Sequence, residues 1–330
     1  MISDFEYHQL TAWFDECQSP MILSHMRPDG DSLGAMAAVH FALQQLGKQP
    51  ESVLYEPIPG QYQFICDMLP WRNWDAVRDV LAHNCDAVVI VDTCALPQLE
   101  PVLDFLPRAP RTLVIDHHAT RDSIGTRSGD LRVFDETAGA VCVMLSEWIR
   151  TLKIKCNAPL ATALFTGIAT DCGWFRFSNT DARTMRITAD LVEAGASPSG
   201  IYNAIYQQEP VAKLRLIANM LTNLELLADG KLAVMYIRAA DFQSTGGDQT
   251  MTSDLVNEAA RLASTEATLL FTEEGDDTIR VNFRSKRRLD VSALARRFGG
   301  GGHARAAGAR LRGSWDNVVP RVIAETMEAL

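Results

Sequence analysis

Three short runs of apolar, β-favouring residues each lead into aspartate or histidine side chains. Runs of this kind predict strands of a parallel sheet that is covered on both faces. The carboxyl ends of parallel strands share one edge of the sheet, and ligands bind at that edge in open α/β folds. The runs are residues 21–23 before 25–31 (His-Met-Arg-Pro-Asp-Gly-Asp), 87–91 before Asp92, and 113–115 before 116–118 (Asp-His-His).

Clustered carboxylates repel one another, so a positive group is expected among them. Imidazole and carboxylate ligands together favour a divalent metal such as Mn²⁺, and this number of ligands suits two ions. Taken singly, each residue also has a structural interpretation, because Asp31 or Ser32 could cap a helix and Asp92 a turn. Asp171, beside a glycine at the end of a predicted helix, is a further candidate ligand.

The pattern along the chain predicts two α/β domains. The first alternates strands and helices, which is typical of a doubly wound, mainly parallel sheet. We expect a catalytic metal-binding domain over 1–195, a helical connection over 196–228 and a smaller mixed α/β domain over 229–330. Helices are predicted at 32–46, 137–152, 158–169, 181–193, 199–206, 210–227, 252–263, 291–298 and 315–330, and second-domain strands at 232–238, 268–272 and 278–284.

The net charge and the cysteine content limit which binding partners and which cellular compartment are expected. The formal net charge of −10 argues against a surface that grips long duplex DNA, but leaves room for a small anionic substrate in a local pocket. The seven cysteines form no C-x-x-C pair, which favours reduced, buried thiols. Neither a signal peptide nor an apolar run near the ~18 residues of a membrane span is apparent. We therefore expect a cytoplasmic protein without a membrane partner.

A glycine-rich motif lies near the C-terminus. Residues 299–303 read Gly-Gly-Gly-Gly-His, and a basic cluster at 284–288 ends a predicted strand. Glycines let the backbone approach a ligand closely, and successive N–H groups can form an anion-binding nest. A flexible loop and a solvated charge run are the alternative interpretations.

The chain resembles the DHH phosphoesterase superfamily, which is named for the triplet found here at 116–118. The first superfamily motif is matched by His25, Asp29 and Asp31, the second by Asp92 and the fourth by Asp171. The resemblance implies that one Mn²⁺ ion binds His25, Asp29 and Asp92. It implies that a second ion binds Asp31, Asp92, His117 and Asp171, with Asp92 as the bridge and Mg²⁺ or Co²⁺ as substitutes for Mn²⁺.

The remaining residues of the triplet have implied roles beside the metals. His118 would face the substrate phosphate, and Asp116 would support the site by orienting a histidine. Together with Asp92, these two residues form the catalytic set that the resemblance implies. The implied chemistry is attack on phosphorus by a metal-activated water, without a protein nucleophile.

The C-terminal part resembles the DHH-associated C-terminal domain. The resemblance implies that Arg284, Gly301, Gly302 and His303 bind the terminal phosphate or the base of a nucleotide, and that the active-site cleft lies between the two domains. In length and motif order the chain is similar to the nano-RNase or oligoribonuclease (NrnA-like) and pAp phosphatase proteins. The implied substrates are short RNA, nucleoside phosphates and linear dinucleotides such as pGpG, which are converted to mononucleotides.

Several alternatives stay open at this stage. The same motifs fit a 3′-phosphoadenosine 5′-phosphate phosphatase, a cyclic dinucleotide phosphodiesterase or a RecJ-like single-strand exonuclease. A nucleotide-binding regulator without catalysis is an alternative from a different class. Residues 174–177 (Trp-Phe-Arg-Phe) could stack a base or pack in the core. Base preference, cleavage polarity and a homodimeric state are also left open.

Overall fold

The computed structural model describes residues 2–252, 254–275 and 277–330, without the side chains of residues 81–83 and 303. The chain divides into two compact units, residues 1–208 and 209–330. The division falls within the segment 196–228, which the sequence predicts as a helical connection. Helix α8 (Pro198–Tyr206) belongs to the first unit and helix α9 (Val211–Thr222) to the second.

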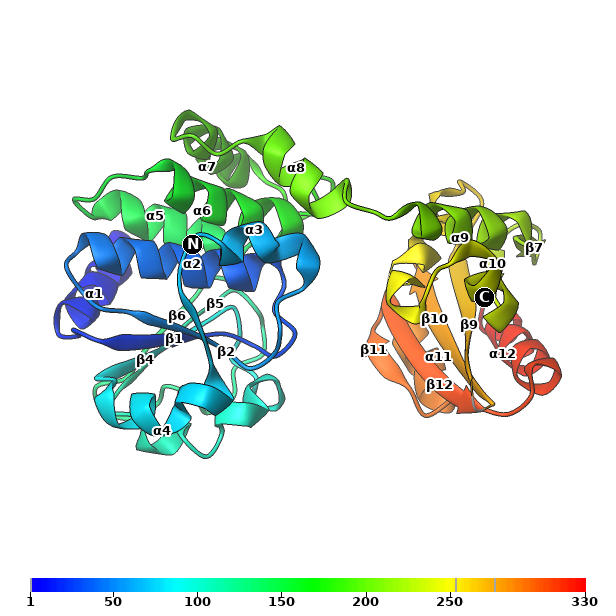
Figure 1. The fold of residues 1–330 in the computed structure, drawn as a ribbon, viewed down its shortest axis with the longest axis horizontal. Helices are drawn as coiled ribbons and strands as arrows, with labels where there is room; N and C mark the ends of the chain where they lie inside the picture. The colour runs from blue at the N-terminus through cyan, green and yellow to red at the C-terminus, as the bar shows by residue number, and fades with distance from the viewer. Residues whose placement is uncertain (1, 253, 276) are drawn as a thin grey trace. The chain divides into compact units, whose positions relative to one another are not determined.

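The first unit is built on a six-stranded parallel sheet with the order β3-β2-β1-β4-β5-β6 (Figure 1). In this order the chain moves outward from β1 to β3 and then crosses back to β4. The register aligns Leu23 with Ile90 and Val91 with Ile115, so the central strands end at one edge. The strands are β1 (Pro20–Leu23), β2 (Glu51–Leu54), β3 (Trp71–Asn73), β4 (Ala87–Val91), β5 (Thr112–Asp116) and β6 (Leu131–Phe134).

Helices cover both faces of this sheet. Figure 1 shows α2, α5 and α6 on one face and α4 on the other. The covering elements are α1 (Asp4–Asp15), α2 (Gly30–Gln45), α3 (Gln63–Cys66), α4 (Trp74–Asn84), α5 (Val141–Thr151), α6 (Ala158–Asp171) and α7 (Ala182–Glu193), with three-ten helices η1 (Gly60–Tyr62), η2 (Leu96–Val102) and η3 (Leu106–Arg108).

The central strands are apolar throughout because alternate side chains enter different cores. Val89 and Val91 pack with the α2, α5 and α6 side, whereas Val88 and Ile90 pack with Trp74 and the three-ten helices. All five residues of β4 are buried. The prediction of a doubly wound, mainly parallel sheet is confirmed.

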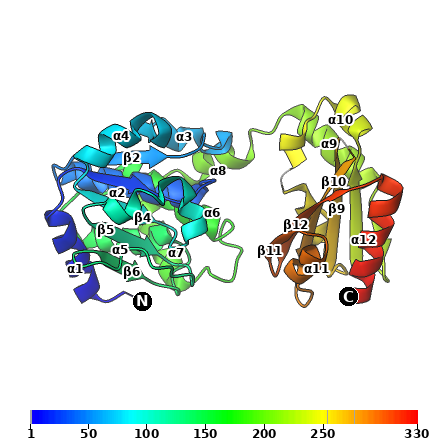
Figure 2. The same cartoon turned by 90° about the horizontal axis from the view of Figure 1, so that it is seen from below.

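The second unit has a mixed six-stranded sheet with the order β11-β12-β10-β9-β8-β7. Only β8 and β9 pair in parallel among its described strands. Helix α12 lies along one face, and α9 with α10 covers the other (Figure 2). Its elements are β7 (Glu225–Leu227), β8 (Leu232–Ile237), α10 (Ala239–Thr245), β9 (Ala267–Gly275), β10 (Thr278–Ser285), α11 (Val291–Arg297), β11 (Gly301–His303), β12 (Ala306–Arg312) and α12 (Trp315–Ala329).

Two predicted helices differ in the structure. The helix expected over 210–227 ends at Thr222, because residues 225–227 pair with β8 as an edge strand. The helix expected over 252–263 is replaced, in its described part, by three-ten turns η4 (Gln249–Thr252), η5 (Leu255–Asn257) and η6 (Ala259–Arg261). Asp254 has a φ of 65°, which is incompatible with a continuous right-handed helix.

Among the helices in the described part of the chain, no helix combines the length and the apolar character that crossing a lipid bilayer requires.

Candidate active site

The candidate site lies where the strand order reverses. Strand β1 has β2 on one side and β4 on the other, and the segments that follow β1 and β4 leave toward opposite faces of the sheet. This arrangement opens a crevice beyond the carboxyl ends of the two strands. His25 follows β1 and Asp92 follows β4, so both enter this crevice.

A first group of ligand-type atoms comes from these two strand ends. His25 Nε2 lies 3.5 Å from Asp92 Oδ2 and 3.9 Å from Asp29 Oδ1. One ligand atom from each of the three residues fits within a span of 4.8 Å. The side chain of Asp92 is only 3% exposed, whereas that of Asp29 is 57% exposed. The group is therefore anchored in the core and opens toward solvent at Asp29.

A second group is centred on His117. Its Nε2 atom lies 4.0 Å from Asp31 Oδ2, 3.6 Å from Asp171 Oδ2 and 3.5 Å from Asp92 Oδ1. Asp92 thus presents Oδ2 to His25 and Oδ1 to His117. One buried carboxylate is shared by both groups, which is the arrangement that a bridging ligand requires.

The imidazole orientations show what the two groups can bind. Nδ1 of His25 donates to the Met26 carbonyl at 2.8 Å, and Nδ1 of His117 donates to the Ala138 carbonyl at 3.1 Å. In the neutral rings Nε2 is then a lone-pair acceptor that faces carboxylate oxygens. His117 Nε2 and Asp92 Oδ1 are buried without a hydrogen-bond partner among the described residues. Acceptors that converge in this way can bind a cation, so these residues are chemically suited to a divalent metal.

The electrostatics agree with this interpretation. Burial alone would lower the pKa of His117, but contact with Asp92 and the charges of Asp31 and Asp171 raise it to about 10. Burial, together with the charges of Asp92 and Asp29, outweighs the opposing charge of His117 and raises the pKa of Asp171 to about 6. Burial and the nearby carboxylates also hold the pKa of Asp31 well above its usual value. Without a cation the cluster retains protons, which is expected where too many acids share one space.

Helix packing brings Asp31 into the second group. Asp29 caps helix α2 by accepting N–H bonds from Asp31 and Ser32, so Asp31 falls in the first turn. Its carboxylate accepts N–H bonds at 2.6 and 3.1 Å from Val141 and Cys142, at the start of α5. The positive end of that helix favours a buried anion. The alternative interpretation, in which Asp31 or Ser32 caps α2, is wrong because Asp29 is the cap.

A glycine on α6 makes room for this carboxylate. A Cβ atom at Gly167 would lie 2.6 Å from Asp31 Oδ1 and 2.3 Å from Cys142 Sγ. The absence of a side chain lets α6 pack closely against α2 and α5. This close packing places Asp171, the last residue of α6, beside His117.

Asp92 also has a strained backbone. Its φ is 62°, in the left-handed region that residues with a side chain seldom occupy. Such strain costs roughly 1–3 kcal/mol and persists where the surrounding structure enforces it, often at functional sites. Here the turn directs the carboxylate between the two histidines.

His118 is held differently from His25 and His117. Its Nδ1 donates to Asp116 Oδ1 at 2.8 Å, and its backbone N–H reaches the same oxygen at 3.1 Å. This hydrogen bond is the main reason why the pKa of His118 is raised. The His118 side chain is 55% exposed, whereas Asp116 is completely buried. Asp116 therefore orients His118 through Nδ1, and this hydrogen bond does not use Nε2.

The other predicted substrate residues gather on the sheet of the second unit. Arg284 on β10 and the backbone of His303 on β11 both pair with Ala306 of the intervening strand β12. Gly302 has a φ of 141°, and a Cβ there would lie 2.5 Å from the Ala306 carbonyl oxygen. Only glycine fits at this point. The side chain of His303 lies outside the described part of the structure.

Several features of the site have no signal in the sequence. The carbonyls of Met26 and Ala138 orient the imidazoles, but any residue type supplies a carbonyl.

The aromatic segment 174–177 could stack a base or pack in the core, and its residues differ in this respect. Trp174 and Phe175 pack against Phe165, with ring centroids 5.9 and 6.0 Å away, whereas Phe177 is 55% exposed.

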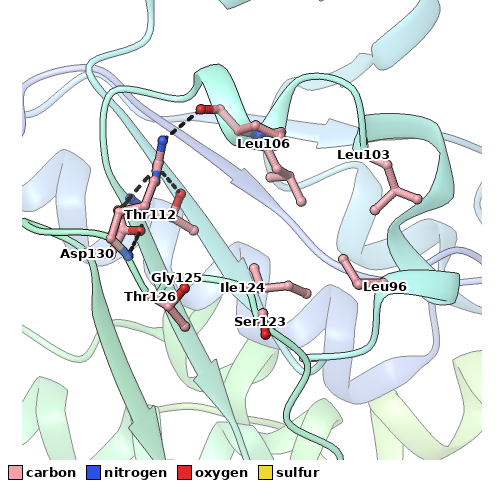
Figure 3. Close-up of a pocket in the computed structure, with 11 residues that line it drawn as sticks. Leu96, Leu103, Leu106, Thr112, Ser123, Ile124, Gly125, Thr126 and Asp130 are labelled. Atoms are coloured by element: carbon pink, nitrogen blue, oxygen red, sulfur yellow. Dashed lines mark hydrogen bonds and ion pairs between the residues drawn. The ribbon is translucent and has the colours of Figure 1, made fainter.

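A separate cavity of about 220 Å³ in the first unit contains none of these residues (Figure 3). Leu103, Leu106 and Ile124 contribute its apolar wall. The polar residues at its end are already paired, because Arg127 binds Asp130 and the Thr112 hydroxyl. This cavity is therefore separate from the two groups of ligand-type atoms.

Comparison with known families agrees with the site. The family model described as "DHH family, N-terminal domain" matches residues 20–168, and the "DHHA1 domain" model matches residues 229–330. The two models together span most of the chain, one in each unit. The chain belongs to the DHH superfamily, and it is a hydrolase of that superfamily.

Individual relatives cover nearly the full length. The chain is similar to "Bifunctional oligoribonuclease and PAP phosphatase NrnA" of Thermus thermophilus, at 27% identity over 94% of this chain and 89% of the relative. The protein of the same name from Bacillus subtilis is 28% identical over 91% of each chain. A crystal structure of an exopolyphosphatase-related protein from Bacteroides fragilis shares the fold, with a TM-score of 0.89, 20% identity and coverage of 99% of this chain and 97% of that chain.

Proposed function

We propose that this protein is a Mn²⁺-dependent phosphodiesterase that hydrolyses short oligoribonucleotides and linear dinucleotides such as pGpG to mononucleotides. The observation that carries the proposal is the shared carboxylate of Asp92, which presents one oxygen to His25 and the other to His117. A two-cation site of this kind suits phosphate esters. The names of the relatives, oligoribonuclease and PAP phosphatase, support a short nucleotide substrate.

The ligand assignment follows the two groups of donor atoms. His25, Asp29 and Asp92 would hold one cation, and Asp31, Asp92, His117 and Asp171 the other. Bound cations would supply a water of lowered pKa and would neutralise charge on the phosphate oxygens. The Nδ1 hydrogen bonds of His25 and His117 would leave each Nε2 available to a cation.

His118 would act on the substrate and not on a metal. Asp116 fixes the half-exposed ring through Nδ1, so Nε2 would be the atom that contacts a phosphate oxygen. The raised pKa of His118 favours its charged form, which donates a charge-assisted hydrogen bond to an anion. Such donors stabilise the charge that develops at phosphorus.

The second unit would bind the end of the substrate. Arg284 donates to Asn257 Oδ1 and to the Phe283 carbonyl, two neutral acceptors, so these bonds leave its positive charge unneutralised. The neighbouring β11 strand carries Gly301, Gly302 and His303, which we propose as the remaining substrate contacts. Together they would take a terminal phosphate or a base.

Product analysis tests the substrate assignment. We would incubate the protein with Mn²⁺ and a 5′-labelled RNA ladder of about two to ten nucleotides, with pGpG in parallel. Fast conversion of the shortest members to mononucleotides, with slow attack on the long ones, is the expected result. Length-independent degradation would instead indicate a RecJ-like exonuclease.

A second activity, removal of a phosphate from 3′-phosphoadenosine 5′-phosphate, is favoured by the bifunctional names of the relatives. Both reactions place one phosphate at the same group of acids and histidines. Release of inorganic phosphate from this nucleotide under the same conditions would establish the second activity.

All seven thiols are free, which supports a reducing compartment, and we propose the cytoplasm.

A further inference from the structure

An amide oxygen without a hydrogen-bond partner among the described residues lies between two arginines on the sheet of the second unit. Asn282 is in the middle of β10, and Arg280 and Arg284 flank it two residues away on the same face. Its Oδ1 atom is buried without a hydrogen-bond partner among the described residues. A buried acceptor left unpaired costs roughly 1–3 kcal/mol, so a residue that served packing alone would be apolar here.

On one side Asn282 pairs with Leu270 of β9, and on the other side it pairs with Gly308 of β12. Gly308 in turn pairs with Gly301 on β11, so the positions level with Asn282 on these two strands carry no side chain. A Cβ atom at Gly308 would lie 3.8 Å from Asn282 Nδ2, so the glycine leaves the Nδ2 side of the amide without a covering side chain from β12. A Cβ at Gly301 would meet nothing within 4 Å. Gly301 and Gly308 therefore form a small floor of bare backbone across two neighbouring strands, on which a flat ring can lie.

The arginines on either side of Asn282 are held by hydrogen bonds to Thr252 and Asn257. Arg284 Nε donates to Asn257 Oδ1 at 3.1 Å, and Arg280 donates to the Thr252 hydroxyl. Arg280 also lies 3.5 Å from Glu274, whereas no carboxylate of the described residues lies within 4.0 Å of the Arg284 guanidinium nitrogens. Glu274 therefore offsets the charge of Arg280, whereas Asp254 acts on Arg284 only from beyond ion-pair distance, so Arg284 is the cation that an anionic group of a ligand would bind.

We infer that Asn282 recognises the edge of a substrate nucleobase that lies on the Gly301–Gly308 floor, with a phosphate of the same nucleotide at Arg284. The inference rests on the proposed function and adds a base-reading residue to it. An asparagine amide offers one donor and one acceptor in a plane, which pairs with two adjacent groups on a base edge. Rotation of the amide exchanges donor and acceptor, so one residue can serve all four bases, as a degradative enzyme needs.

Substitution of Asn282 tests the inference through base selectivity. The substrates are pApA, pGpG and the chromogenic diester bis(p-nitrophenyl) phosphate, all with Mn²⁺. Asn282→Ala should lower kcat/KM on both dinucleotides about 10- to 100-fold and leave the chromogenic diester unchanged. Asn282→Asp offers acceptors only and matches the adjacent N1–H and N2–H donors of guanine. It should therefore raise the ratio of pGpG to pApA turnover about tenfold.

Asn317→Ala, on the exposed surface of α12, is the matched control and should behave as the wild type. Unchanged dinucleotide kinetics in Asn282→Ala would overturn the inference. Equal loss on all three substrates would also overturn it, because that result indicates a structural role. If the wild type hydrolyses neither dinucleotide, the proposed function fails separately. Calorimetry with pApA then decides the inference, and equal affinity of wild type and Asn282→Ala would overturn it.

Discussion

At the scale of single residues, the site depends on pairs in which one side chain acts and another orients it. Asp116 is completely buried and contacts the exposed His118 through one short hydrogen bond. The same division holds for His25 and His117, whose orienting partners are backbone carbonyls. The orienting groups fix the direction of the imidazole rings and do not themselves contact the substrate.

Replacing Asp116 separates orientation from metal binding. We expect Asp116→Asn to lower kcat on a dinucleotide about 10- to 100-fold, because His118 loses its charged partner and its fixed ring. The number of Mn²⁺ ions bound per chain should stay the same. A loss of bound Mn²⁺ that parallels the loss of activity would instead make Asp116 a ligand. Metal analysis beside steady-state kinetics distinguishes the two outcomes.

The sequence anticipated the polar residues of the site better than their surroundings. Asp92, His117 and Asp171 stand next to strand or helix ends, and strand ends in a parallel sheet meet at one edge. The strained φ of Asp92 could not be predicted, because it depends on both neighbouring strands. The unpaired amide of Asn282 was also missed, since an asparagine in a strand has no sequence signal of its own.

At the scale of elements, one arginine ties together three segments around the first sheet. Arg183 on α7 binds Glu147 on α5 through two bonds of 2.6 Å, and it binds Asp135, which follows β6, at 2.8 Å. Tyr7 on α1 donates to the same Glu147 at 2.5 Å. Because Arg183 and Asp135 are nearly inaccessible, these pairs are screened less than surface ion pairs.

This network predicts how the free energy of unfolding falls at acid pH. Burial would raise the pKa of Asp135, but bonds from Thr137 and Arg183 lower it to about 2. A pKa below the unfolded value of about 3.9 contributes stability that is complete above pH 4 and lost as the pH falls toward 2. The expected contribution is about 2 kcal/mol.

Asp135→Asn should therefore lower the free energy of unfolding at pH 7 and flatten its fall between about pH 4 and pH 2. Urea unfolding at several pH values measures both effects. Glu193→Gln on the exposed side of α7 is the control, and its curve should follow the wild type. An Asp135→Asn curve that keeps the full acid slope would contradict the role of this network.

Contact between helices α2 and α6 gives a second prediction at this scale. Gly167→Ala places a methyl group within 2.6 Å of Asp31 Oδ1 and within 2.3 Å of Cys142 Sγ. We expect a loss of about 1–3 kcal/mol in unfolding free energy and a lower kcat, because Asp31 must move. At Gly60 an added Cβ meets nothing within 4 Å, so Gly60→Ala should have little effect on either quantity.

Predicted and observed elements agree where the hydrophobic pattern is strong. Strands β4, β5, β9 and β10 lie where their apolar runs predict them. The pattern was wrong over 252–263, where Asp254 in a left-handed conformation interrupts a helical periodicity. It was also wrong over 225–227, because tertiary pairing with β8 overrides local helix propensity.

At the scale of the whole molecule, the two units divide the proposed work. The first unit holds the acids and histidines of the candidate metal site, and the second holds Arg284, the glycine-rich strand β11 and Asn282. The division at residues 208 and 209 follows two distinct cores. We therefore expect substitutions of the acids and histidines of the candidate metal site to affect every phosphodiester, and substitutions at Arg284 and Asn282 to affect nucleotides selectively.

The most direct test of the central claim is the turnover of pGpG by Asp92→Ala in the presence of Mn²⁺, with Asp67→Ala as the exposed control. Asp92 is the one residue shared by both groups. Loss of a shared ligand should reduce kcat/KM at least about 1000-fold in a protein that remains folded by circular dichroism. That result would support the bridged site. A folded Asp92→Ala protein that hydrolyses pGpG at the wild-type rate would contradict it.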